Sequence, residues 1–305
     1  MLFDGSQHRH AELAALQWGG SDLEHLQTSG NAVYRMTRRG EPVILRLGHP
    51  RHRSAEHDRA EVEFVAHLER CAVPVAAPIA ADDGRLVLAS GEYSATAFRW
   101  APGRCVGPRD PEWGEPLVRE WGRVLGMIHR AALTHEPPGA PRRWHWADEY
   151  LWREASELIP RDDIASHREL ESVVAFASSS FLEMPASFGM IHADFAPQNF
   201  HVDGTRLTAF DFGNCCYHHL AADVAISLST IRGRKDRDHV RAWLLDGYAD
   251  AMPITFDDEQ LDWLIRLRVV YVYLTRLKAF GESPSAEQRE ILDGMRTAVH
   301  RERGW

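Results

Sequence analysis

The pattern of hydrophobic and polar residues predicts strands in the first third of the chain, together with one long helix. Two apolar runs, residues 30–36 and 42–47, lie on either side of Arg39-Gly40, which is typical of a β-hairpin. Residues 54–70 place valine, phenylalanine and leucine at helical spacing. Residues 86–88 and 93–100 then read as extended chain, so we expect a small sheet with one helix.

The rest of the chain shows mainly helical periodicity. Helices are predicted around Trp18 within residues 1–22 and over residues 110–133, 166–184, 224–228, 243–251 and 261–280. Because the segment 261–280 is apolar nearly all round, we expect it to be buried. Ala101-Pro102-Gly103 reads as a connector, which predicts one part over residues 1–101 and a second over residues 102–305.

The most informative stretch runs from residue 189 to residue 223. Apolar residues on either side of Asp203-Gly204 predict a tight hairpin, which returns Asn199 and Asp211 to the same open end. Asp194 lies five residues before Asn199, on the loop that enters the hairpin. Hard cations such as Mg²⁺ prefer oxygen ligands of this kind, and one carboxylate is left to accept a proton.

This order of residues is typical of a kinase. An aspartate that orients and deprotonates a hydroxyl is followed by an asparagine and a second aspartate that hold ions on the nucleotide's phosphates. The alternative is an ordinary β-turn that carries polar side chains with no catalytic role. His-x-Asp, then Asn five residues later, then Asp-Phe-Gly twelve residues further on favours the kinase interpretation.

Residues 192–199, His-Ala-Asp-Phe-Ala-Pro-Gln-Asn, resemble the catalytic loop of the aminoglycoside phosphotransferase and choline kinase family. The resemblance implies an α+β, two-lobe protein-kinase-like fold, with an antiparallel-sheet N-terminal lobe and a mostly helical C-terminal lobe. It also implies a small-molecule hydroxyl acceptor, ATP or GTP as donor, and Mg²⁺. Asp194 would be the catalytic base, Asn199 and Asp211 the metal ligands, and His192 and Asp223 the structural support of the loop.

Three residues of the loop depart from the family pattern, which has Gly, His and Gly at these positions: Ala193, Ala196 and Gln198. None of the three replaces a group that carries charge in the reaction.

The resemblance also implies a nucleotide site in the first part. Arg46 stands where kinases carry a phosphate-binding lysine, and an arginine can bind phosphate bidentately. Glu61 would pair with it, with Glu63 as the alternative partner. The turn containing Gly30 and Asn31 would cover the phosphates.

The strand that ends the first part would contact the adenine, at Phe98 and Trp100. A purely structural interpretation remains open for each of these residues. The turn would then be an ordinary hairpin loop, Arg46 a solvent-facing strand residue, and Glu61 a solvated helix residue.

Composition narrows the class of protein. The chain has 305 residues, 44% hydrophobic and 26% charged, and its net charge is 35 − 44 = −9. This acidic balance argues against a nucleic-acid or anionic-membrane partner, since both need clustered Lys and Arg. The amino terminus has no apolar segment of a secretory signal, so we expect a cytoplasmic protein. The cluster Cys215, Cys216, His218 and His219 is spaced too closely to favour a zinc site.

The acceptor site is less defined. Trp144, Trp146, Tyr150 and Trp152 lie within nine residues and predict either a cage for an organic cation or packing around an inserted helix. His129 is expected in the core. Three other functions remain open: a bacterial protein Ser/Thr kinase of the same fold, a non-catalytic nucleotide-binding protein, and a metal-dependent hydrolase.

Overall fold

The computed structural model describes residues 5–28, 30–51, 53–136, 143–180 and 187–301. Its contacts divide the chain into two compact units that are interleaved in sequence. The sheet unit comprises Met1–Glu112, Thr134–Arg143 and Pro197–Gly213, and the helical unit comprises Trp113–Leu133, Trp144–Ala196 and Asn214–Trp305. The division into lobes at residues 1–101 and 102–305 stays a prediction.

The sheet unit contains a five-stranded antiparallel sheet of order β1-β2-β3-β5-β4. Its elements are α1 (Gln7–Gln17), β1 (Gly20–Thr28), β2 (Asn31–Arg38), β3 (Glu41–Gly48), α2 (Ala55–Arg70), β4 (Val87–Ser90) and β5 (Tyr93–Arg99). The predicted hairpin and helix are therefore present. The helix expected within residues 1–22 ends at Gln17, and β1 was not predicted. Most side chains of β1 are exposed, so this edge strand carries no apolar alternation.

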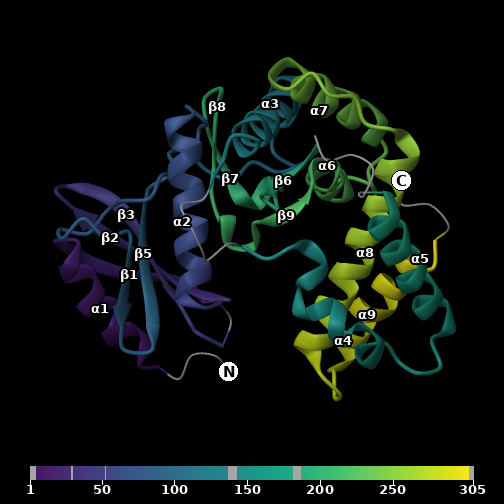
Figure 1. Ribbon diagram of the computed structural model, residues 1–305, viewed down its shortest axis with the longest axis horizontal. Coiled ribbons are helices and arrows are strands. Elements are labelled where there is room, and N and C mark those ends of the chain that lie inside the picture. The colour runs from purple at the N-terminus through teal and green to yellow at the C-terminus, as the bar shows by residue number, and fades with distance from the viewer. Residues whose placement is uncertain (1–4, 29, 52, 137–142, 181–186, 302–305) are drawn as a thin grey trace. The chain divides into compact units, whose positions relative to one another are not determined.

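The two faces of the sheet have different chemistry. Leu45 and Leu47 are fully buried in a cluster with Trp18, on the side of α1. Arg46 lies between these leucines and therefore points to the opposite face, where it meets Glu61 of α2. Figure 1 shows α1 and α2 on opposite sides of the sheet.

The predicted hairpin of the central stretch is part of the sheet unit. It comprises β7 (Phe200–Asp203) and β8 (Arg206–Ala209), and Gly204 has φ +60° at the turn. The Ala76 N–H donates to the Ala209 carbonyl (2.8 Å), which anchors the hairpin to the connector after α2. Chain segments more than a hundred residues apart thereby form one unit.

The helical unit consists of helices around a short antiparallel ribbon (Figure 1). Its elements are α3 (Glu115–Ala132), η1 (Trp146–Asp148), α4 (Tyr150–Leu158), α5 (Ile164–Ser180), β6 (Phe188–Ile191), β9 (Cys216–His219), α6 (Leu220–Ser229), α7 (Arg237–Ala251), α8 (Asp258–Phe280) and α9 (Ala286–Val299). The ribbon and α9 were not predicted. Helix α3 begins five residues later than expected, with a proline in its first turn, where the missing N–H leaves no hydrogen bond unmade. Residues 181–184 of the predicted helix 166–184 lie outside the described residues.

Helices α3 and α7 approach each other closely because glycines lie at their contact. A Cβ atom at Gly122 would come within 1.9 Å of the Leu244 carbonyl oxygen, and one at Gly247 within 1.9 Å of the Arg119 carbonyl oxygen. No side chain fits at either position without moving the helices apart.

Helix α8 is buried along one face rather than all round. Leu261, Leu264 and Leu274 are buried, whereas Val269 and Val272 are half-buried. The expectation of complete burial was wrong because polar and charged residues, such as Thr275, Arg276 and Lys278, leave the other face of this helix partly in solvent.

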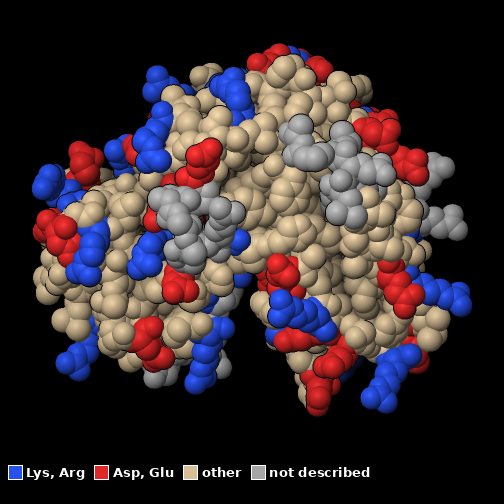
Figure 2. Space-filling model, viewed as in Figure 1, with Lys and Arg blue, Asp and Glu red and all other residues tan. Residues whose placement is uncertain are grey.

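No helix of the described residues is long and apolar enough to cross a membrane. On the face shown in Figure 2, acidic and basic side chains are mixed over the surface of both units.

Candidate functional site

A cavity of about 530 Å³ lies within the sheet unit. The predicted site residues that line it are Asn31, Arg46, Glu61, Phe98, Trp100, Asn199 and Asp211. Gly30 forms the turn before β2 and is not among the lining residues. Four segments, namely β2, β3, α2 and the open end of the β7–β8 hairpin, therefore bring polar residues to one cavity.

Arg46 and Glu61 form a bidentate ion pair at the wall of this cavity. The two guanidinium nitrogens donate to the two carboxylate oxygens at 2.7 and 2.9 Å, and both residues are at most 5% exposed. Burial alone would lower the pKa of Arg46, but the neighbouring carboxylates of Glu61, Asp58 and Asp211 raise it above its ordinary value. Burial alone would raise the pKa of Glu61, and Arg46 holds it below the usual range. Glu63, the alternative partner, is half-buried outside this pair.

Two further charged residues surround the pair, and sequence reasoning missed both. Asp58 lies 3.9 Å from Arg46 and accepts a hydrogen bond from Ser94; burial raises the pKa of its carboxyl. Arg143 is buried and donates to the His57 carbonyl (3.1 Å) and to the Gly213 carbonyl. Arg143 thereby ties α2 to the loop that carries Asp211.

Asn199 and Asp211 stand at the two ends of the hairpin. The Phe210 N–H donates to the Asn199 carbonyl at 3.0 Å, which keeps the ends paired. Asp211 has φ +63°, a left-handed conformation that costs free energy for a residue with a Cβ atom. The direction of the Asp211 side chain depends on this strained backbone angle. Asn199, at the other end, is buried.

The donor set of this cavity fits a hard divalent cation. Mg²⁺ is usually held by one or two protein oxygens together with phosphate and water, and Asn199 and Asp211 supply two such oxygens. Asn31 adds a buried side-chain oxygen that has no hydrogen-bond partner among the described residues and is available to a ligand. In the part of the chain that the structure describes, no group of three or more His, Cys, Asp or Glu is placed to hold a metal ion by itself.

Phe98 and Trp100 contribute aromatic side chains to the lining of the cavity. The Arg46 guanidinium lies 5.1 Å from the centre of the Phe98 ring, and the Trp100 ring lies edge-on to His201 at 6.2 Å. A ring nitrogen of His201 donates to the Ala101 carbonyl at 2.8 Å. Aromatic walls of this kind suit a flat heterocycle.

Asp194 lies in the helical unit, on a loop that is held by Asp223. The Asp223 carboxylate is fully buried and accepts from the N–H groups of His192 (2.7 Å) and Ala193 (2.9 Å). The Asp194 N–H in turn donates to His192 Nδ1 at 3.3 Å. Ala193 has φ +63°, so the loop turns through a left-handed residue immediately before Asp194.

Asp223 is linked onward to α3 and α7. His129 Nε2 donates to Asp223 at 3.2 Å, and Nδ1 of the same ring accepts from the Tyr248 hydroxyl at 2.9 Å. Burial, with the negative charge of Asp223, raises the pKa of Tyr248 above its ordinary value, so its hydroxyl stays protonated. His129 is a core histidine, as expected. Tyr248 was not predicted as a site residue, because a tyrosine within a helical pattern indicates only a side chain packed in the core.

Arg268 of α8 is a second missed residue of this unit. Its guanidinium donates to Asp194 Oδ1 at 2.5 Å, and both side chains are about one-fifth exposed. In the sequence Arg268 appears only as one of several charges that interrupt an apolar helix.

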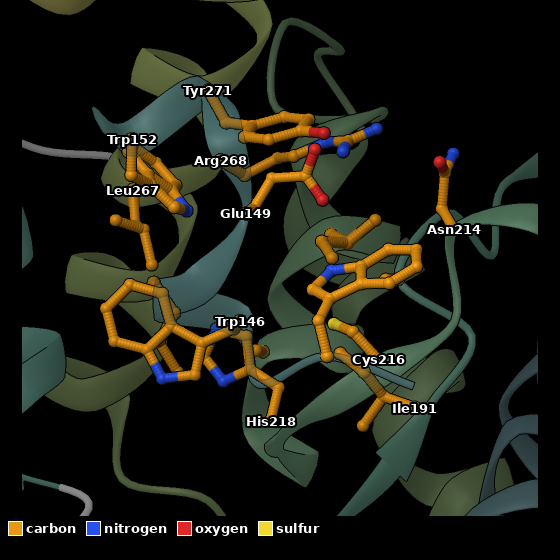
Figure 3. A pocket seen from close by; sticks show the side chains of 15 residues that line it. Trp146, Glu149, Trp152, Ile191, Asn214, Cys216, His218, Leu267, Arg268 and Tyr271 are labelled. Atoms are coloured by element: carbon orange, nitrogen blue, oxygen red, sulfur yellow. The ribbon is translucent and has the colours of Figure 1, made fainter. Parts of the chain in front are cut away.

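A smaller pocket, of about 70 Å³, lies beside this loop within the helical unit (Figure 3). Aromatic and charged residues contribute to its lining: Trp144, Trp146, Trp152, Tyr271, Glu149 and Arg268. Tyr150, which was grouped with the tryptophans, does not line it and instead packs against Lys278, 4.1 Å from the ring centre. Three of the four predicted aromatic residues therefore meet at one pocket, where Tyr271 of α8 joins them.

The predicted cysteine and histidine cluster is used in packing. Cys215 and Cys216 are buried, and the His218 ring stacks on Trp146 at 4.9 Å. His219 Nδ1 accepts from the Ala221 N–H at the start of α6. Burial lowers the pKa of His218 well below its ordinary value and that of His219 to about 4.

Comparison with known proteins shows the family of the chain. The profile of the family described as "Phosphotransferase enzyme family" matches residues 25–264. The chain belongs to this family. The phosphotransferase is therefore an enzyme, and its small antiparallel sheet and helical remainder form the predicted protein-kinase-like fold.

Individual relatives of the phosphotransferase include kinases of small molecules. It is 27% identical to the amicoumacin kinase of Bacillus subtilis (strain 168), over 94% of this chain and 90% of the relative. It is 28% identical to the homoserine kinase of Sinorhizobium medicae (strain WSM419), over 72% and 67% respectively. The solved structure of an amicoumacin kinase in complex with AMP-PNP, Ca²⁺ and Ami matches 98% of this chain and 94% of its own, with a TM-score of 0.86 and 23% identity.

Proposed function

We propose that the chain transfers the γ-phosphoryl group of ATP, bound with Mg²⁺, to a hydroxyl group of a small molecule. The observation that supports this most directly is the cavity of the sheet unit, where a buried Arg46–Glu61 pair and the oxygens of Asn199 and Asp211 line one space. This is the combination of a phosphate-binding cation and metal-binding oxygens that phosphoryl transfer needs.

In this proposal each residue of the sheet unit has a defined role. Arg46, aligned by Glu61, binds the α and β phosphates through its remaining N–H groups. Asn31 contributes its amide to the phosphates, and Phe98 and Trp100 contact the base. Asn199 and Asp211 hold Mg²⁺, which when bound neutralises the charge that develops on the phosphate oxygens.

Asp194 acts on the acceptor. Its carboxylate accepts a hydrogen bond from the acceptor hydroxyl and takes the proton as the oxygen forms a bond to the γ-phosphorus. The bond between that phosphorus and the bridging β-γ oxygen breaks, and ADP leaves. We assign Arg268 a positioning role, because its guanidinium donates to Oδ1 of Asp194.

We expect Asp194→Ala and Asp211→Ala to abolish phosphoryl transfer, by about a thousandfold or more in kcat, while the melting temperature changes little. Both side chains are at least partly exposed, so their removal leaves no cavity in a core. The measurement is acceptor-dependent ADP release over a library of hydroxyl compounds, followed by ³¹P detection of the phosphorylated product.

Asp203→Ala is the matched control, because this exposed aspartate ends β7 within the same hairpin but does not line the cavity. It should keep wild-type turnover. Full activity in Asp194→Ala or Asp211→Ala would refute the assigned roles. Binding of ATP and Mg²⁺ without turnover on any acceptor would instead favour a non-catalytic nucleotide-binding protein.

A further inference from the structure

Arg143 is a buried arginine of the sheet unit, and its side chain is 0% exposed. One guanidinium nitrogen, Nη1, donates to the His57 carbonyl of α2 at 3.1 Å. The other, Nη2, donates to the carbonyl of Gly213, two residues after Asp211. The two arms of one guanidinium therefore join helix α2 to the loop of Asp211 through backbone carbonyls.

The neighbouring carboxylate serves another arginine. Glu61 lies 4.0 Å from Arg143, at the outer limit of an ion pair, whereas it accepts from both guanidinium nitrogens of Arg46 at 2.7 and 2.9 Å. Hydrogen bonds from a charged donor are stronger than those between neutral groups, so a guanidinium is well suited to hold backbone carbonyls in place. The bonds of Arg143 to His57 and Gly213 are thus more than a by-product of charge pairing.

The loop that accepts from Arg143 has a strained backbone. Asp211 has φ +63°, a conformation that persists only where the surrounding structure holds it. A Cβ atom at Gly213 would lie 3.2 Å from Asp211 Oδ1 and 3.9 Å from Nη1 of Arg46. The backbone of Gly213 therefore lies close to the Asp211 carboxylate, and a shift of this backbone would move the carboxylate.

Phe212, between these two residues, also contacts α2. Its ring is buried and meets the ring of Phe64 edge-on at 6.0 Å. Apolar packing of this kind is non-directional, whereas a hydrogen bond prefers a defined angle between donor and acceptor. Packing can hold the loop near α2, and the bonds of Arg143 add a constraint on its orientation.

We propose that Arg143 is a positioning residue for Asp211. By holding the Gly213 carbonyl, it keeps the Asp211 carboxylate in the direction that presents it to Mg²⁺, and by holding the His57 carbonyl it fixes that direction relative to α2. This inference rests on the proposed function, because it assumes that Asp211 binds the metal of a nucleotide complex. Mg²⁺ demands near-ideal octahedral geometry, so a rotation of one ligand weakens its binding.

The test replaces Arg143 with methionine, which is unbranched and apolar, and with lysine, which keeps the charge. The single ammonium of lysine does not reproduce the fork that holds two carbonyls. The full chain is titrated with Mg²⁺ in the presence of a fluorescent ATP analogue, and the midpoint is the Mg²⁺ concentration at half of the maximal signal. We expect the midpoint to rise by about tenfold or more in both variants, because residues that orient a metal ligand typically contribute about 10–100-fold to metal affinity.

The maximal signal separates positioning from a loss of folded protein. At saturating Mg²⁺ it should reach the wild-type level, because the remaining residues of the cavity are unchanged. A partly unfolded variant would instead lose maximal signal and keep its midpoint. Arg38→Met is the matched control, because Arg38 belongs to the same unit and donates to the Ala80 carbonyl at 3.1 Å but does not line the cavity. It should keep the wild-type midpoint.

Circular dichroism shows whether each variant folds, and if Arg143→Met does not, Arg143→Lys carries the test with the same expected result. The inference is overturned by a wild-type midpoint in a folded variant, by a maximal signal that stays reduced at saturating Mg²⁺, or by an equal rise of the midpoint in Arg38→Met. Failure of both Arg143 variants to fold also overturns it, since Arg143 would then be a residue needed for folding.

The wild type separates this inference from the proposed function. If its binding of the analogue does not depend on Mg²⁺, or if it does not bind the analogue, the proposed function is refuted and this inference with it. If wild-type binding depends on Mg²⁺ and the Arg143 variants keep the same midpoint, this inference alone is refuted.

Discussion

Ala193 shows how a single backbone angle shapes the loop that carries Asp194. Its φ of +63° is a conformation that costs about 1–2 kcal/mol for a residue with a Cβ atom, and glycine adopts it without strain. The family pattern that residues 192–199 resemble has glycine at this position. The N–H of Ala193 still reaches Asp223, so the loop keeps its hydrogen bond and carries the strain.

We therefore expect Ala193→Gly to stabilise the protein by about 1 kcal/mol, after the greater entropy of the unfolded glycine chain is subtracted. The melting temperature, measured by calorimetry, should rise by about 2 °C. Ala196→Gly is the control in the same loop, because Ala196 has no positive φ and is buried. It should lower the melting temperature, and a rise there, or a fall in Ala193→Gly, would contradict this account.

The sequence predicted the residues that belong to an ordered motif, and it missed single residues whose partners lie far away in the chain. Asp194, Asn199 and Asp211 follow one another at fixed spacing around a recognisable turn. Arg143 and Arg268 have no such spacing, since their partners come from other parts of the chain. Their function depends on tertiary contacts that a local pattern does not encode.

Helix α6 carries Asp223 and begins at a histidine that caps it. His219 Nδ1 accepts from the Ala221 N–H at 3.2 Å, and the other ring nitrogen bonds to Ser187. Capping requires an unprotonated Nδ1, because a protonated nitrogen has no lone pair to accept with. Burial holds the pKa of His219 at about 4, below the ordinary value of 6.5.

The sign of the pH dependence follows from these two values. Between pH 6.5 and 4 the unfolded chain binds a proton at His219 that the folded chain does not, so stability falls as the pH drops through this window and is fully present above it. The loss is on the order of 3 kcal/mol at pH 4. The pKa values of His218 and His135 are also lowered, so the wild type should lose more free energy of unfolding than His219 alone accounts for.

His219→Asn isolates the contribution of this one residue, because asparagine caps a helix without titrating. Urea unfolding at pH 4, 5.5 and 8 should show a smaller loss of free energy for the variant than for the wild type. Equal losses would show that His219 is not the titrating cap.

Elements with a strong apolar period were predicted, and elements without one were not. Helix α2 and the β7–β8 hairpin have buried faces and clear end signals, such as Ser54 at the N-cap and Asp203-Gly204 at the turn. Strand β1 is exposed, and the β6–β9 ribbon has only four residues in each strand. Helix α9 is mostly exposed and buries few apolar residues, so its pattern gives a weak signal.

The whole molecule is built from a chain that repeatedly passes between its two units. One passage falls within the loop of residues 192–199, since Asp194 belongs to the helical unit and Pro197 begins the last segment of the sheet unit. A prediction of lobes from sequence assigns each lobe a continuous range. The sequence alone therefore does not predict the interleaving, because it depends on the unit against which the β7–β8 hairpin packs.

This arrangement predicts that residues 1–112 alone do not form the proposed nucleotide site. That fragment lacks Asn199, His201, Phe210 and Asp211, all of which line the cavity. We expect the affinity of the fragment for a fluorescent ATP analogue with Mg²⁺ to be at least about a hundredfold lower than that of the full chain.

The full chain serves as the positive control in the same fluorescence titration. Adding residues 197–213 back through a flexible linker should restore part of the binding. Wild-type affinity in the unsupplemented fragment would show that the hairpin is dispensable for the nucleotide.

The two glycines at the contact of α3 and α7 have a consequence far from their own position. Those helices also carry His129 and Tyr248, the residues behind Asp223, so the spacing of the two helix axes sets where Asp223 holds the loop of Asp194, the proposed base. A methyl group added at position 122 or 247 would force the axes apart, so we expect an alanine at either glycine to disturb the Asp194 loop from a distance.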